Sequence, residues 1–218
     1  MSAMAGPGRV GQPWARPTPR SLVMIPALIA ANVAVFVVTV AQSGSVSDNA
    51  SAALFHQWAL QPEAVAHGAW WQLFTSGFLH FGPLHLTFNM IALWVIGRDL
   101  EQVLGRVRFG VVYLVSLLGG SLVVFAFANP IFTFVNPLSQ TAGASGAVFG
   151  LMGGLAVVLI RLRLSPRPAL TIILLNLIIT FTVPNISIFG HLGGLAFGAA
   201  VTAAMVYTPR KTPLKTTS

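Results

Sequence analysis

The chain has 218 residues, of which 55% are hydrophobic and only 7% are charged. A soluble domain carries about 25% charged residues, so this composition excludes an ordinary soluble protein and indicates a bundle of membrane helices. The absence of cysteine excludes disulfides, thiolate metal sites and a cysteine nucleophile.

The N-terminal residues 1–20 are rich in Pro, Gly and Arg and predict a disordered tail. An apolar run from Leu22 to Ala41 follows, and its length suits a helix that crosses a bilayer. A signal peptide is the alternative, because Arg16 and Arg20 precede the run. The run is longer than the apolar core of about 7–15 residues in a signal peptide, so we expect a retained helix.

Residues 42–79 mix aromatic with polar side chains, which is typical of a segment in the membrane interface. An ordinary extracytoplasmic loop is the alternative. The aromatic residues concerned are Phe55, Trp58, Trp70, Trp71 and Phe74.

Further apolar segments cover 80–97, 109–128, 142–160, 169–183 and 188–207. The sequence therefore predicts an all-α membrane protein, a bundle of six transmembrane helices within residues 21–207, followed by a tail over 208–218. Some segments are short, which implies a thinned bilayer or tilted neighbours.

The basic residues predict the orientation of this bundle. Residues 42–83, 129–141 and 184–190 contain no Lys or Arg, so the positive-inside rule puts both termini and both tails in the cytoplasm. The net charge of +8 is then explained by topology, and no nucleic-acid partner is expected. The twelve basic residues form four clusters: Arg9, Arg16, Arg20; Arg98, Arg106, Arg108; Arg161, Arg163, Arg167; and Arg210, Lys211, Lys215.

Four polar residues lie near the outer starts of three predicted helices. They are His85 and Asn89, Ser145, and His191. Polar groups in apolar helices cost free energy and often mark function. Taken alone, the serine could bond back to a carbonyl, and a histidine could be a proton relay, a metal ligand or a structural group. Their shared depth favours a single site.

Two glycine stripes point to a nucleophile and its base. If the stripes face each other, Ser145 and His191 come within hydrogen-bond reach, as an activated serine requires. Such stripes also occur as packing devices without chemistry. The stripes are Gly146, Gly150 and Gly154 on one helix, and Gly190, Gly194 and Gly198 on another.

The four acidic residues, Asp48, Glu63, Asp99 and Glu101, lie in the first loop or at the cytoplasmic end. We therefore infer a Ser–His dyad whose imidazole is oriented by packing. No HExxH motif occurs and no carboxylate lies near an intramembrane histidine, so neither a metal nor a cofactor is expected.

An oxyanion needs hydrogen-bond donors. His85 and Asn89 are one turn apart and could supply them, together with the backbone N–H of Ser145 at a helix start. Gly143 is assigned to the same oxyanion or substrate-binding region. Interhelical hydrogen bonding alone is the other interpretation of His85 and Asn89.

Four motifs, in order over residues 20–207, resemble those of rhomboid proteases. The stretch 80–89 resembles the family's second helix, and Gly143-Ala144-Ser145-Gly146 resembles its GxSG motif. Gly190-His191-Leu192-Gly193-Gly194 resembles the histidine motif, and 97–105 is similar to the glutamate-and-glycine pattern that ends the second helix.

The resemblance implies a six-helix serine protease that cleaves single-pass membrane proteins in or near their transmembrane segments, after a small residue. It implies access between the second and fifth helices under a cap at 184–190. Phe149 matches the aromatic residue on which the family's catalytic histidine packs. Glu101 would then be a structural residue that ties the cytoplasmic end. Many members carry Trp-Arg in the first loop where this chain has Trp71-Gln72, so the contacts of that arginine must be replaced or absent.

The sequence leaves two competing functions open. One is a non-cleaving rhomboid-like protein that binds membrane clients. The other is a small transporter with a histidine relay, for which ionisable groups spread across the membrane would be expected. The expected location is a bacterial plasma membrane, with an organellar inner membrane as the alternative. The natural substrate and the oligomeric state do not follow from the sequence.

Overall fold

A computed structural model describes residues 21–128, 136–183 and 186–208. The predicted tails over 1–20 and 209–218 lie outside these residues. The described chain is mostly helical and contains no strand, apart from an isolated bridge between Leu60 and Thr141. Its helices are α1 (Met24–Ser43), η1 (Asn49–Ser51), α2 (Ala53–Trp58), α3 (Pro62–Ala66), α4 (Gln72–Thr75), η2 (Ser76–Phe78), α5 (Gly82–Leu104), α6 (Arg106–Phe127), α7 (Ser145–Arg161), α8 (Arg167–Thr182) and α9 (Ile188–Tyr207).

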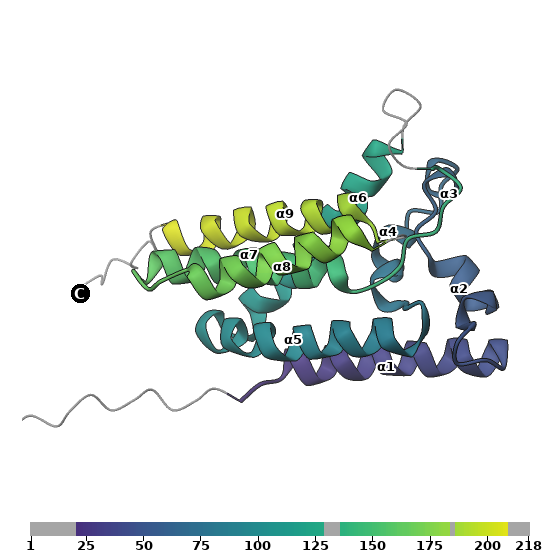
Figure 1. Ribbon diagram of the computed structural model, residues 1–218, viewed down its shortest axis with the longest axis horizontal. Coiled ribbons are helices and arrows are strands. Elements are labelled where there is room, and N and C mark those ends of the chain that lie inside the picture. The colour runs from purple at the N-terminus through teal and green to yellow at the C-terminus, as the bar shows by residue number, and fades with distance from the viewer. Residues whose placement is uncertain (1–20, 129–135, 184–185, 209–218) are drawn as a thin grey trace, which may run out of the picture.

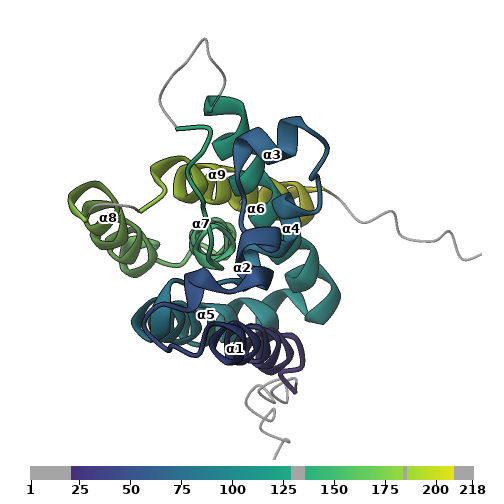
Figure 2. The same ribbon diagram turned by 90° about the vertical axis from the view of Figure 1, so that its right-hand side faces the viewer.

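The long helices form a bundle around α7. Figure 1 shows α1 and α5 side by side on one side of the bundle, with α7, α8 and α9 on the other. In the view along the helices, α7 lies at the centre (Figure 2). Most of α7 is accordingly buried, including small residues such as Ala147, Gly150 and Gly154. The helix that begins with Ser145 is therefore the most buried of the long helices.

Several helices meet the requirements for a membrane span. By length and apolar character these are α1, α6 and α9, with a fourth if the bent pair Gln72–Phe78 and Gly82–Leu104, inclined by 93°, is one span. The helices α7 and α8 are apolar but shorter, with 17 and 16 residues. Large apolar side chains such as Leu84 and Phe88 are about 70% exposed, as lipid-facing residues are. These features indicate a helical, multi-pass membrane protein.

The long helices follow the predicted segments, and the largest difference is at the end of α5. The apolar run ends at residue 97, but the helix continues through a charged stretch to Leu104. It does so because Leu100, Glu101 and Leu104 are buried on one face, and Gly105, with φ at 79°, then ends the helix.

The Glu101 carboxylate joins α5 to the start of α1. It accepts hydrogen bonds from the backbone N–H groups of Val23 (2.9 Å), Met24 (2.9 Å) and Ile25 (3.2 Å). The first N–H groups of a helix have no partner within the helix, and a carboxylate there also complements the helix dipole. Glu101 is thus the N-terminal cap of α1 and has the structural role that the resemblance implied.

Short helices occupy the segment 42–79, and side-chain to backbone hydrogen bonds hold it in place. The Asn49 amide donates to Thr39 Oγ1 (3.0 Å) and to the His80 carbonyl (2.8 Å), and its oxygen accepts from the Gly82 N–H (2.9 Å). Buried Gln72 accepts from the Gln61 N–H (3.0 Å) and donates to the Gln57 carbonyl (3.3 Å). The glutamine therefore supplies loop contacts at the position where many family members carry arginine.

Candidate active site

Ser145 is the first residue of α7, and the turn before it is fixed by the first loop. Thr141 exchanges two backbone hydrogen bonds with Leu60 (2.9 and 2.8 Å), and the Gly143 N–H donates to the Ser76 carbonyl (3.0 Å). Gly143 has φ at 133°, a conformation that residues with a Cβ rarely adopt. The serine is therefore presented from a constrained turn at the amino end of a buried helix.

His191 lies in the first turn of α9, opposite Ser145. The turn is capped by Ser187, whose side chain accepts from the Gly190 N–H (3.1 Å). The imidazole Nε2 lies 2.8 Å from Ser145 Oγ, within hydrogen-bond distance. The imidazole also stacks on Phe149, with ring centroids 4.1 Å apart and planes 18° apart. Phe149 thus makes the contact that the resemblance implied.

Glycine makes this approach of α7 and α9 possible. A Cβ added at Gly194 would collide with the backbone of Gly146, and one added at Gly198 would collide with the backbone of Gly150. The two predicted stripes therefore meet directly, backbone against backbone. The Ser145–His191 distance follows from this contact, since each residue adjoins its stripe.

A third helix, α6, shares this glycine interface, which the sequence did not reveal. A Cβ at Gly120 would lie 2.6 Å from the Gly190 carbonyl oxygen, and one at Gly150 would collide with the Ser116 side chain. The adjacent Gly119 and Gly120 were the available signal in the sequence.

The His85 imidazole lies beside the serine. Its Nδ1 accepts from the Phe81 N–H (3.2 Å), so Nε2 carries the hydrogen of the neutral ring. A Cβ built on Gly143 would lie 2.9 Å from this Nε2 and 3.6 Å from Ser145 Oγ. Gly143 thus leaves room for the imidazole, whose N–H is available to a group bound next to the serine.

Asn89 is buried one turn along α5 from His85. Its amide donates to the His85 carbonyl (2.9 Å), which uses one of its two N–H donors. Among the described contacts, no hydrogen bond joins Asn89 to Ser145 or His191. The prediction that Asn89 supports the same site therefore remains a prediction.

Thr180 of α8 is a member of the site that the sequence did not reveal. Its Oγ1 lies 2.7 Å from His191 Nδ1 and donates to the Asn176 carbonyl (2.8 Å). The side chain is only 2% exposed. In sequence, a threonine in an apolar helix cannot be told from one that merely bonds back to its own helix.

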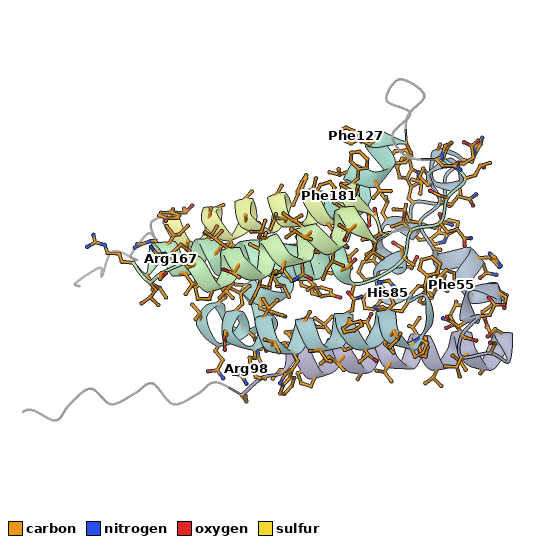
Figure 3. All side chains as sticks on the ribbon, viewed as in Figure 1. Phe55, His85, Arg98, Phe127, Arg167 and Phe181 are labelled. Atoms are coloured by element: carbon orange, nitrogen blue, oxygen red, sulfur yellow. The ribbon has the colours of Figure 1, made fainter. Side chains whose placement is uncertain are left out.

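The polar residues of the site and the basic residues lie at different depths. Figure 3 shows Arg98 and Arg167 at one end of the bundle and His85 displaced toward the other end, where Phe55 lies. Within the described ranges, no three His, Asp or Glu side chains come together in a way that could hold a metal ion.

Comparisons with known proteins find similar sequences. Residues 67–208 match the Rhomboid domain. The chain is 38% identical over 146 residues to the rhomboid protease GluP of Bacillus subtilis (strain 168), which covers 65% of this chain and 27% of GluP. It is 35% identical over 140 residues to YdcA of the same organism (62% and 66% covered) and 34% identical over 145 residues to RHOMBOID-like protein 4 of Arabidopsis thaliana (64% and 35% covered). The chain thus spans between about a quarter and two thirds of the length of these relatives.

Proposed function

Because this chain belongs to the rhomboid family, we propose that it is an intramembrane serine endopeptidase in which Ser145 is the nucleophile and His191 its base. The observation that carries the proposal is the distance of 2.8 Å between Ser145 Oγ and His191 Nε2 inside a helical membrane bundle. A serine hydroxyl becomes an effective nucleophile when a base within hydrogen-bond reach takes its proton.

The reaction follows from this pair. Ser145 Oγ attacks the scissile carbonyl carbon while its proton passes to His191 Nε2, which gives a tetrahedral oxyanion and an imidazolium. The imidazolium then protonates the leaving amine, and the C–N bond breaks to leave an acyl-serine. A water molecule, deprotonated by His191, hydrolyses the ester and restores the enzyme.

The oxyanion is stabilised by donors around Ser145. His85 Nε2–H lies next to the serine across Gly143, and the Ser145 N–H stands at a helix start, where the dipole favours negative charge. Asn89 contributes from the next turn of α5, through its second amide hydrogen or by holding His85. One such donor is typically worth about 3–4 kcal/mol in the transition state.

The proposed topology has six spans, with both termini in the cytoplasm and the site open to the opposite side. The clustering of basic residues supports it, as does the position of Arg98 and Arg167 at one end of the bundle (Figure 3). Here α7 and α8 count as short spans, and residues 21–207 form the protease domain. Exposed Trp70 and Trp71 support an interfacial place for the first loop, 42–79.

The proposed substrates are single-pass membrane proteins, cut in or near the transmembrane segment after a small residue. They enter between α5 and α8. Of the cap predicted at 184–190, residues 188–190 form the start of α9, and residues 184–185 lie outside the described ranges. The proposed location is a bacterial plasma membrane, in keeping with the Bacillus subtilis relatives. The lipid bilayer surrounds both the enzyme and its substrate.

The test is cleavage of a fluorescent transmembrane substrate by the purified chain in detergent. We expect cleavage by wild type and a loss of about a thousandfold or more in Ser145→Ala and His191→Ala, with matched melting temperatures. The variant His67→Ala, at an exposed histidine of the first loop, is the control and should cut normally. Equal cleavage by all four proteins would refute the dyad. If the wild-type protein neither cleaves the substrate nor is labelled at Ser145 by a fluorophosphonate, the proposed protease activity is refuted.

A further inference from the structure

We propose that Thr180 is a positioning residue that selects the tautomer of His191, in the place that a carboxylate takes in a Ser-His-Asp triad. The inference rests on the proposed function. It concerns a side chain of α8 that lies behind the imidazole, on the side away from Ser145.

The geometry forms a relay of three hydrogen bonds. Thr180 Oγ1 lies 2.8 Å from the Asn176 carbonyl oxygen and 2.7 Å from His191 Nδ1. On the far side of the ring, His191 Nε2 lies 2.8 Å from Ser145 Oγ. The hydroxyl is buried, so these protein groups take the place of water around it.

Proton counting gives the relay a direction. A carbonyl oxygen only accepts, so the one hydroxyl proton of Thr180 is donated to Asn176. In this arrangement Thr180 Oγ1 acts as an acceptor toward the imidazole, and we assign the ring proton to Nδ1. Nε2 is left unprotonated and faces the Ser145 hydroxyl, which is the tautomer that a general base needs.

Stacking on Phe149 alone does not select the tautomer of His191. The Phe149 ring fixes the plane of the imidazole, with only 18° between the two rings. A flat apolar face cannot choose which nitrogen holds the proton, nor fix the rotation of the ring within its plane. The hydrogen bond to Thr180 fixes both the protonated nitrogen and the rotation of the ring within its plane. It also connects α8 to the dyad on α7 and α9.

The first test separates the hydroxyl from the bulk of the side chain. In Thr180→Val the shape is retained and the acceptor is lost, whereas Thr180→Ser keeps the acceptor. We expect kcat to fall about 10- to 100-fold in Thr180→Val with KM within about twofold, and Thr180→Ser to recover most of the loss. The matched control is Thr182→Val, which removes an exposed hydroxyl bonded only to its own helix, at Ile178 (2.7 Å) and Ile179 (3.4 Å).

The second test does not depend on cleavage. Nitrogen-15 NMR of histidine-labelled protein in lipid distinguishes a ring protonated at Nδ1 from one protonated at Nε2, and the His191 signal is assigned by its loss in His191→Ala. Wild type should show the Nδ1–H form, and Thr180→Val a mixture of the two tautomers.

The outcomes are separable. An unchanged kcat in Thr180→Val, or an Nε2–H ring in wild type, would overturn the positioning role. If wild type cuts nothing but its tautomer depends on Thr180, the proposed protease fails and the positioning stands. If Thr182→Val lowers kcat as much as Thr180→Val, the effect belongs to the helix and the proposal fails.

Discussion

Phe149 lies flat against His191, with ring centroids 4.1 Å apart, at the point where α7 meets α9. Both residues are buried, and both adjoin the glycine contact between the two helices. The imidazole therefore has a fixed plane before any substrate arrives, which reduces the reorganisation that the proposed proton transfer requires.

Replacing this ring should slow the reaction without abolishing it. An aromatic pair is worth about 0.5–1.5 kcal/mol beyond its buried area, so Phe149→Leu should lower kcat/KM by about 2- to 12-fold. Phe149→Tyr keeps the stacking surface and should stay near wild type. Steady-state cleavage of the fluorescent substrate measures both, and a Phe149→Leu enzyme as fast as wild type would show that stacking is unimportant.

Gly143 should tolerate no side chain. In Gly143→Ala the new methyl group would lie about 2.8 Å from His85 Cε1 and would push the imidazole away from the serine. We expect cleavage to fall more than about tenfold, as on removal of an oxyanion donor. Gly68→Ala is the control, because Gly68 also has positive φ, at 105°, but open space around it. Equal losses in the two variants would attribute the effect to backbone strain instead.

Glu101 should contribute to stability and not to chemistry. Glu101→Gln keeps the size of the side chain but removes the charge that three backbone N–H groups share. We expect the free energy of unfolding to fall by about 1–3 kcal/mol. Asp99→Asn, at an exposed side chain next to Arg98, should change it by less than about 0.5 kcal/mol. Unfolding in mixed detergent and denaturant gives both values, and similar losses would argue against the cap.

The glycine contact between α7 and α9 should be intolerant of a methyl group. Gly198→Ala forces a Cβ into the Gly150 backbone and should cost about 1–3 kcal/mol of stability. Because the helices would move apart, activity should fall as well. Ala196→Val adds bulk to an exposed position on the same helix and is expected to be neutral. A stable, active Gly198→Ala protein would mean that the contact is not tight.

Much of this arrangement could be predicted from the sequence. Hydropathy located the long helices because a membrane span must be apolar along most of its length. The glycine stripes predicted which faces meet, and the proximity of Ser145 to His191 was inferred from them. Hydropathy alone stops at residue 97, and only the resemblance of 97–105 to the family's pattern indicated that the second helix ends further on, as α5 does at Leu104. Hydropathy could not show this extension, because burial of Glu101 against the start of α1 depends on a residue far away in the chain.

Other features had no local signal. Thr180 and Asn49 act through hydrogen bonds to residues on other elements, such as His191 for Thr180 and the His80 carbonyl for Asn49. Nothing in their sequence neighbourhood distinguishes them from ordinary polar residues. The role of α6 in the glycine contact depends on how three helices converge, which hydropathy does not encode. Such relationships appear only when the tertiary structure is known.

The cap of α1 also constrains the order of assembly. Val23 and the glutamate that receives its N–H are separated by 78 positions. During synthesis the first helix therefore emerges with its amino end uncapped, and it stays so until the whole of α5 has been made. Docking of α1 onto α5 thus cannot be completed before α5 has been made, and a ribosome-bound chain that stops short of Glu101 should leave the amino end of the first helix accessible to cross-linking.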